Sequence, residues 1–426
     1  MASQSEDNLH IQAPIQFAAE AEDAKAKEGH KLLQILKNDP LRDVHPLALQ
    51  VRSLDMSFSD ETRTFSWIGA ASLWRNTLHR SLPAILDILQ NLHAFQLKFE
   101  QSMDWNTIGS FLQTSLVRLF ASPKLTRVSI NKVHNFRPEI LRCPNLRDLR
   151  LDSVWVKSFF ITERRSSSFA CTPPALPWAA QSFQSLHNFD ARFSDDVLKR
   201  IRCTQEKGLL DSPFSRLRNY TIYMPMDGDI LNHWWAMKRA SQTLECLTVD
   251  QEVPCHSDSY NHFPGPICLS DFISLRTLVL KVSALPNDPL SALHHLTFLL
   301  NPDRYEPTTV RSLILNVNFP TNMDSISARA TSDLIFSQDN ATPLWKSIEN
   351  ALLGPAFPCL QKVQFTFKWM SSNIEDNSTE NDAKSTNVKE EMDVMECICG
   401  RMDTALPKVV CSEIEFEADW KVCNAY

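Results

Sequence analysis

The sequence has 426 residues, of which 43% are hydrophobic and 22% are charged, so it contains enough apolar material for a sizeable core. Its formal net charge of −7 provides no basic surface that would attract nucleic acid or an anionic membrane. Glycine is scarce, with 8 residues in the whole chain, and no two of them lie two positions apart. Phosphate-binding loops need glycines where the backbone approaches the ligand closely, so Walker and dinucleotide-binding motifs are absent.

The chain carries no signal for export or for membrane insertion. No apolar run approaches the ~18 residues of a membrane-spanning helix, and residues 1–30 lack both the basic and the apolar region of a signal peptide. The eleven cysteines are scattered without a CxxC pair, and an odd number favours reduced thiols over a disulfide framework. We therefore predict an intracellular protein, cytoplasmic or nuclear, that does not bind membranes.

One hydrophobic frame recurs along the chain: an apolar residue, two variable residues, an apolar residue, one variable residue and a third apolar residue. The last two apolar positions are two residues apart, so each frame predicts a β-strand with one buried face. The eleven frames are Val51/Leu54/Met56, Leu92/Phe95/Leu97, Leu125/Val128/Ile130, Leu146/Leu149/Leu151, Leu186/Phe189/Ala191, Leu217/Tyr220/Ile222, Leu244/Leu247/Val249, Leu275/Leu278/Leu280, Val310/Leu313/Leu315, Leu360/Val363/Phe365 and Cys411/Ile414/Phe416.

Helical periodicity fills many of the intervals between frames. Apolar residues recur at three- and four-residue steps in segments 104–120, 194–203, 227–240, 289–300, 342–353 and 389–406. Ser194 before two aspartates, and Asp288 before Pro289, are good helix starts. Strands that alternate with helices pair in parallel, with the helices on one face of the sheet. We therefore predict an α/β fold, an irregular leucine-rich-repeat-like solenoid with parallel strands on the concave face and helices on the convex face.

We expect this solenoid to cover residues 30–426. Residues 1–29 are rich in alanine and charge without an apolar stripe, so we predict a disordered or helical N-terminal tail. Residues 371–388 contain almost no apolar side chain and are predicted to be a disordered insertion. Such a segment cannot offset the ordering entropy of about 1–2 kcal/mol per residue.

Two stretches of the chain resemble a known family. Residues 142–151, RCPNLRDLRL, resemble the cysteine-containing leucine-rich repeats of F-box proteins. Residues 30–40, HKLLQILKNDP, followed by VRSL at 51–54, are similar to the segment after the F-box in fungal F-box/leucine-rich-repeat-like proteins. The resemblance implies a scaffold whose repeats hold a protein substrate for a ubiquitin ligase. Residues 1–29 contain nothing like an F-box, so a Skp-type adaptor is expected as a partner only if an F-box exists upstream.

The residues that alternate with the frame positions point to the opposite, concave face of the predicted sheet. Arginine and tyrosine in this column belong to the residue types enriched at binding hot spots. The candidate partner-binding residues are Arg127, Arg150, Arg192, Tyr223 and Lys281. The alternative is that a polar, solvated sheet face only keeps the solenoid soluble.

No motif assigns a catalytic residue, a cofactor or a metal site. The densest set of potential metal ligands is Cys255, His256, His262 and Cys268, but side chains of adjacent residues diverge and make poor joint ligands. An enzyme, hydrolase-like and with an unrecognised site near loop 255–268, is the alternative hypothesis; scarce glycine and the lack of a GxSxG nucleophile context count against it. We therefore predict a non-catalytic protein–protein interaction scaffold, in a narrower version a ubiquitin-ligase substrate receptor without its F-box.

Overall fold

The computed structural model describes residues 34, 47–58, 78–156, 185–206, 214–223, 230–251, 269–285, 288–300, 306–319, 333–336, 339–371 and 400–424. The predicted tail, residues 1–29, and the predicted insertion beyond Ser371 lie outside these described residues. The chain divides into two compact units, Met1–Ser215 (unit 1) and Arg216–Tyr426 (unit 2), and each is described by itself. The strand frame continues through both units.

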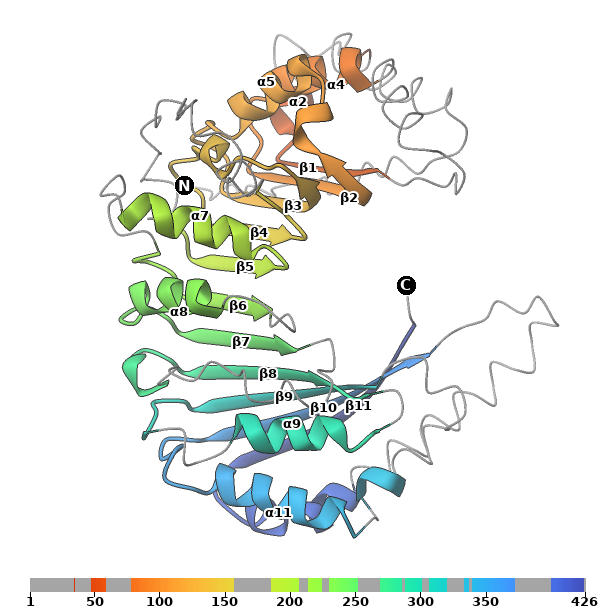
Figure 1. Cartoon of the computed structure of the whole chain (residues 1–426), viewed down its shortest axis with the longest axis vertical. Helices are drawn as coiled ribbons and strands as arrows, with labels where there is room; N and C mark the ends of the chain where they lie inside the picture. The colour runs from red at the N-terminus through yellow and green to blue at the C-terminus, as the bar shows by residue number, and fades with distance from the viewer. Residues whose placement is uncertain are drawn as a thin grey trace, which may run out of the picture. The chain divides into compact units, whose positions relative to one another are not determined.

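The described residues of unit 1 form five strands, which pair in parallel in chain order. They are β1 (Ser53–Phe58), β2 (Ala94–Asp104), β3 (Arg127–His134), β4 (Asp148–Asp152) and β5 (Asn188–Arg192) (Figure 1). The described helical segments of this unit are α2 (Leu47–Gln50), α4 (Leu78–Ile88), η1 (Trp105–Thr107), α5 (Ser110–Leu119), η2 (Pro138–Ile140) and α7 (Asp195–Glu206).

Unit 2 repeats this plan: in its described ranges there are six strands, again parallel and in chain order. They are β6 (Asn219–Tyr223), β7 (Cys246–Gln251), β8 (Thr277–Ser283), β9 (Ser312–Phe319), β10 (Lys362–Ser371) and β11 (Glu415–Asn424). Its described helical segments are α8 (Ile230–Arg239), η5 (Leu269–Asp271), α9 (Ser291–Leu299), α11 (Ala341–Leu352) and α13 (Pro407–Val410). No helix in the described ranges is long and apolar enough to cross a membrane.

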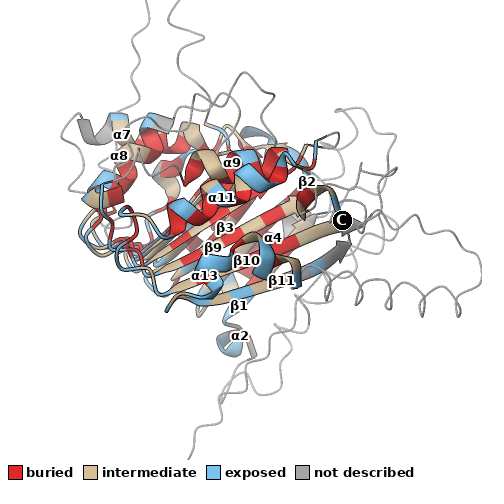
Figure 2. Ribbon diagram, turned by 90° about the horizontal axis from the view of Figure 1, so that it is seen from below, coloured by how far each residue is buried: buried red, intermediate tan, exposed pale blue. Residues whose placement is uncertain are grey.

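The strand registers confirm the hydrophobic frame as the unit of the fold. In unit 1, Val128 pairs with Leu149 and Leu149 with Phe189, so the second frame position forms one buried row across three strands. Leu146, Leu149 and Leu151 are 0%, 2% and 0% exposed, as predicted. Figure 2 shows the buried residues gathered on the helices and strands where these elements face one another. Parallel α/β architecture is therefore confirmed within each unit.

The last frame is placed differently from its prediction. The register pairs Val363 with Phe416 and Phe365 with Ala418, so Phe416 occupies the second frame position and not the third. Cys411, predicted as the first frame residue, is exposed at the end of α13. Because the shift is by two residues, the alternation of faces along β11 is unchanged.

The structure places the two predicted helix starts close to their predicted positions, but with different capping contacts. Helix α7 begins at Asp195, directly after Ser194. The Ser194 hydroxyl, however, accepts a hydrogen bond from the Val154 amide at 3.1 Å and donates one to the Arg192 carbonyl at 2.8 Å. It therefore joins the segments that follow β4 and β5. Helix α9 begins at Ser291 and not at Pro289; its preceding turn is closed by Asp288, which accepts from the Leu290 amide at 3.0 Å.

Cys143, the cysteine of the family-like motif, belongs to the core. Its side chain is buried, and its thiol donates to the Phe120 carbonyl at 3.0 Å. Phe120 is the residue that ends α5, and its carbonyl also accepts from the Arg142 amide at 2.9 Å. Burial raises the pKa of the Cys143 thiol to about 12, so the thiol stays protonated and can donate. The Cys143 thiol therefore provides a second hydrogen bond to a carbonyl at the carboxyl end of a helix.

Candidate interaction surface

The face of the unit 1 sheet that alternates with the buried frame positions is polar, and we call it the polar face of unit 1. The strand registers arrange its side chains in three rows across β3, β4 and β5. The rows are Arg127/Asp148/Asn188, Ser129/Arg150/Asp190 and Asn131/Asp152/Arg192. Each row crosses three neighbouring strands, so residues far apart in the sequence become lateral neighbours.

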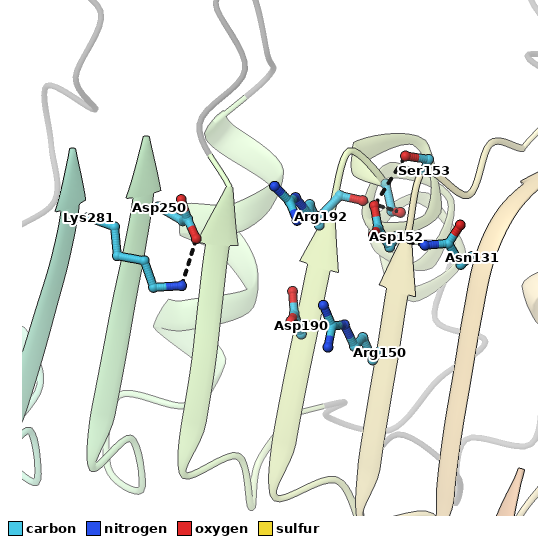
Figure 3. A network of polar contacts seen from close by, with 9 residues as sticks. Asn131, Arg150, Asp152, Ser153, Asp190, Arg192, Asp250 and Lys281 are labelled. Atoms are coloured by element: carbon cyan, nitrogen blue, oxygen red, sulfur yellow. Dashed lines mark hydrogen bonds and ion pairs between the residues drawn. The ribbon is translucent and has the colours of Figure 1, made fainter. Parts of the chain in front are cut away.

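Opposite charges on neighbouring strands pair within the first two rows. The Arg127 Nε lies 3.2 Å from Oδ2 of Asp148, whose Oδ1 accepts from the Asn188 side-chain amide. In the second row, the Arg150 Nε lies 3.6 Å from Oδ2 of Asp190. Figure 3 shows the Arg150 and Asp190 side chains turned toward one another from β4 and β5. Each arginine is thus oriented by a carboxylate on the following strand.

The third row is held by neutral donors. The side-chain amide of Asn131 donates to Oδ2 of Asp152 at 3.0 Å, and the Ser153 hydroxyl donates to Oδ1 of the same carboxylate at 3.1 Å (Figure 3). Arg192 has an intermediate exposure, and its guanidinium lies 5.7 Å from the centroid of the Phe193 ring, within the range of a cation–π contact. Arg192 is therefore less available than the arginines of the other rows.

Arg127 and Arg150 are the most accessible of the predicted partner-binding residues. Their side chains are 68% and 57% exposed. Exposed ion pairs of this kind contribute only about 0–1 kcal/mol to stability, so they mainly fix the position of the guanidinium groups. The structure therefore places two oriented arginines on adjacent strands of one sheet, in successive rows of the polar face.

Tyr223 does not lie on an accessible surface, which corrects its proposed role as a contact residue. It is only 2% exposed, although its position at the end of β6 has the same alternation as the polar residues. Its register partner Asp250 is also buried, at 6% exposure, so the sheet is covered at this point. A side chain with so little exposed area cannot supply binding energy by contact.

Lys281 is held in an ion pair within unit 2. Its Nζ lies 2.8 Å from Oδ2 of Asp250, its register partner on β7 (Figure 3). The Lys281 side chain is 32% exposed, whereas that of Asp250 is 8% exposed. The other carboxylate oxygen of Asp250 is buried without a hydrogen-bond partner. Lys281 is thus committed to a partly buried carboxylate and is less available than Arg127 or Arg150.

The carboxyl-terminal strands of unit 2 carry a second charged cluster. The Lys362 Nζ on β10 lies 2.6 Å from a carboxylate oxygen of Glu417 and 3.1 Å from one of Glu415, both on β11. The hydrogen bonds that the Lys362 ammonium donates, first to Glu417 and then to Glu415, raise the pKa of Lys362. One ammonium group faces two carboxylates, so this part of the sheet is acidic.

The carboxylates that orient the arginines were missed in the sequence analysis, although a usable signal was present. Aligning the frames of β3 and β4 places Arg127 beside Asp148, and aligning those of β4 and β5 places Arg150 beside Asp190. Opposite charges that occupy equivalent positions of successive frames predict cross-strand pairs. The frame was used to place polar residues on one face of each strand, but the polar positions of successive strands were not aligned with one another.

The Cys/His-rich loop, residues 255–268, lies outside the described residues. Among the residues that the structure does describe, no three His, Cys, Asp or Glu side chains come together as a metal site would require. In comparisons with known proteins, the sequence matches no family model and no curated protein. The surface is therefore interpreted from its own geometry.

Proposed function

We propose that this chain is a non-enzymatic, intracellular protein-interaction scaffold, an irregular leucine-rich-repeat-like solenoid similar to the substrate-recognition region of F-box proteins. Its partner is a protein that binds the polar face of unit 1. In the narrower form of the proposal, the bound protein is a substrate for a ubiquitin ligase, and a Skp-type adaptor joins the complex only if an F-box is present upstream.

The oriented pair of arginines is the observation that supports this proposal most directly. Arg127 and Arg150 project from adjacent strands and are more than half exposed, and each lies beside a carboxylate of the next strand. Binding orders flexible side chains at a cost of about 0.5–1.5 kcal/mol each, so side chains already held in place bind with less loss of entropy. Arginine is also among the residues that dominate measured binding energies.

The charge pattern of the polar face indicates what kind of partner surface it fits. Acidic and basic side chains alternate on neighbouring strands, so no single sign of charge dominates this face. A mixed pattern is matched by a folded partner surface with the complementary arrangement, and less well by a polyanion such as nucleic acid. We therefore propose a protein partner, with carboxylates opposite Arg127 and Arg150.

Partner capture with matched variants tests the proposal. Full-length chain is cross-linked to its partners in cells, the partner is identified by mass spectrometry, and its affinity is then measured with purified proteins. Arg127→Ala with Arg150→Ala should weaken binding about tenfold or more at unchanged melting temperature. Arg118 is the matched control residue, because its side chain lies on α5, is 69% exposed and pairs with Asp87. If Arg118→Ala weakens binding and the polar-face pair does not, the interface lies on the helical side.

The ubiquitin-ligase form of the proposal has its own test. Purified chain is mixed with a Skp-type adaptor, and complex formation is measured by size-exclusion chromatography with light scattering. A stable complex supports a receptor role. Failure to bind the adaptor, together with loss of partner binding in the Arg127/Arg150 variant, leaves a scaffold that does not itself recruit a ligase.

A further inference from the structure

An exposed tryptophan lies beyond the carboxyl end of β4, away from the arginines of the polar face. Trp155 is 45% exposed. Its backbone is fixed to the neighbouring strand, because its amide donates to the Val133 carbonyl at 2.9 Å and its carbonyl accepts from the Phe136 amide at 2.9 Å. An exposed indole on a fixed backbone offers a large contact area at little cost in conformational entropy.

The Trp155 ring stacks on a histidine of the neighbouring strand. The imidazole of His134, the last residue of β3, lies at an interplanar angle of 8° and a centroid distance of 6.1 Å. Phe136, whose amide donates to the Trp155 carbonyl, forms an edge-to-face pair at 5.7 Å with Trp105, and both of these rings are buried. The exposed indole is therefore held against His134, and its backbone is attached to a residue of the aromatic core.

Two hydrogen-bonded carboxylates lie at the ends of the strands on either side of β3, which carries His134. Asp104 is the register partner of His134, and its oxygens accept from the Asn106 amide at 2.8 Å and from the Asn135 side chain at 2.7 Å. Asp152 ends β4, three residues before Trp155, and accepts from the Asn131 amide and the Ser153 hydroxyl. All four of these donors are neutral, so these hydrogen bonds hold the carboxylates in place without themselves neutralising the charge. Arg192, the register partner of Asp152, has its guanidinium 5.7 Å from the centroid of the Phe193 ring.

We propose that Trp155, His134, Asp104 and Asp152 form a docking site for a guanidinium side chain, presented by an arginine-containing segment of a protein partner. Tryptophan is the aromatic side chain that binds cations best through its ring face. The carboxylates at the ends of β2 and β4 are already hydrogen bonded, so they add attraction without needing to be ordered. This site is separate from Arg127 and Arg150, which would instead attract carboxylates.

The site can be tested with a defined probe on the full-length chain. The protein is labelled with 5-fluorotryptophan, and the fluorine resonance of Trp155 is assigned by its absence in Trp155→Phe. The probe is an acetylated peptide of four Gly-Arg repeats, and its neutral control replaces every arginine with citrulline, which has nearly the same shape. The arginine peptide should shift the Trp155 resonance saturably, with an affinity about fivefold or more above that of the citrulline peptide.

Variants separate this site from general attraction to an acidic protein. Asp104→Asn with Asp152→Asn should weaken binding of the arginine peptide about threefold or more. Asp403→Asn with Glu413→Gln removes the same charge from exposed positions of unit 2 and should change it by less than twofold. If Asp104→Asn with Asp152→Asn lowers the melting temperature, the affinities of the arginine and citrulline peptides are instead compared on wild-type protein at low and high salt. High salt should then weaken binding of the arginine peptide and leave that of the citrulline peptide unchanged.

Three outcomes overturn the proposal: an unshifted Trp155 resonance, equal affinity for the arginine and citrulline peptides, or equal effects of the two pairs of variants. The second outcome would indicate an apolar docking surface. Trp155→Leu leaves Arg127 and Arg150 in place, so failure at this site is distinguishable from failure of the polar-face proposal.

Discussion

Arg127 and Asp148 are register partners on β3 and β4, with Nε and Oδ2 3.2 Å apart. They lie 21 residues apart in the sequence. They meet because the hydrophobic frames of β3 and β4 pair in register. The side chains are 68% and 27% exposed, so water screens much of their attraction. The pair therefore positions a guanidinium on the surface more than it stabilises the fold.

A double-mutant cycle should show this small coupling. Arg127→Ala, Asp148→Asn and the double variant are compared by urea denaturation. The coupling free energy between the two side chains should not exceed about 1 kcal/mol. A coupling above about 2 kcal/mol would mean that the pair is a structural element, and its role as an accessible contact would lose its basis.

Leu149→Asp should prevent folding of unit 1. Leu149 is 2% exposed and lies in the row between Val128 and Phe189. A carboxylate there loses its hydration without gaining a partner, which costs several kcal/mol against a total stability of about 5–15 kcal/mol. Circular dichroism and thermal melting test this, with Arg150→Ala as the control on the opposite face. A soluble Leu149→Asp protein that melts cooperatively would contradict the buried-row model.

Cys143 should resist thiol reagents in the native protein. Burial raises its pKa to about 12, and its thiol donates to the Phe120 carbonyl, so almost no thiolate is available to react. Cys203, Cys359 and Cys411 are exposed and serve as internal controls. Iodoacetamide labelling followed by peptide mass spectrometry should modify these three first, and Cys143 only after denaturation. Equally fast labelling of Cys143 in native protein would show that the end of α5 is open.

His295 should make unit 2 less stable in acid. Its pKa is lowered from 6.5 to about 4, first by burial and then by the nearby His294, while Asp288 acts in the opposite direction. The unfolded chain then binds a proton at higher pH than the folded chain, so stability falls as the pH drops from about 6.5 toward 4. The full loss is about 3 kcal/mol.

Urea titrations between pH 7 and pH 4.5 on wild type and His295→Gln measure this contribution. The wild type should lose more stability than the variant across this interval, because the variant cannot bind the proton. Parallel pH profiles of the two proteins would show that other groups control the acid sensitivity. His294→Gln should change the pH profile less than His295→Gln, since His294 is exposed on the same helix and is the smaller cause of the shift.

The frame predicted from the sequence identified most strands because it follows burial with a period of two, which large apolar residues mark clearly. It was wrong at β11, where the register places Phe416 and Ala418, both of intermediate exposure, at the second and third frame positions. Alanine is too small to mark a frame position, so Ile414 was selected in its place. Parallel pairing of the strands could be predicted from the sequence because helical segments lie between successive strand frames.

The candidate site was predicted less completely. The alternation placed Arg127 and Arg150 on the correct face, since it depends only on local geometry. The burial of Tyr223 could not be predicted in the same way, because it depends on what covers that end of the sheet. Trp155 lies outside the frame altogether, and its stacking on His134 arises from hydrogen bonds between segments distant in the sequence.

The most direct test of the central claim is arginine footprinting of the partner complex. Phenylglyoxal modification of Arg127, Arg150 and Arg118 is measured by mass spectrometry in the free chain and in the complex with the captured partner. The polar-face proposal predicts that Arg127 and Arg150 become protected in the complex while Arg118 on α5 reacts as before. Protection of Arg118, with Arg127 and Arg150 still fully reactive, would contradict it and place the partner on the helices.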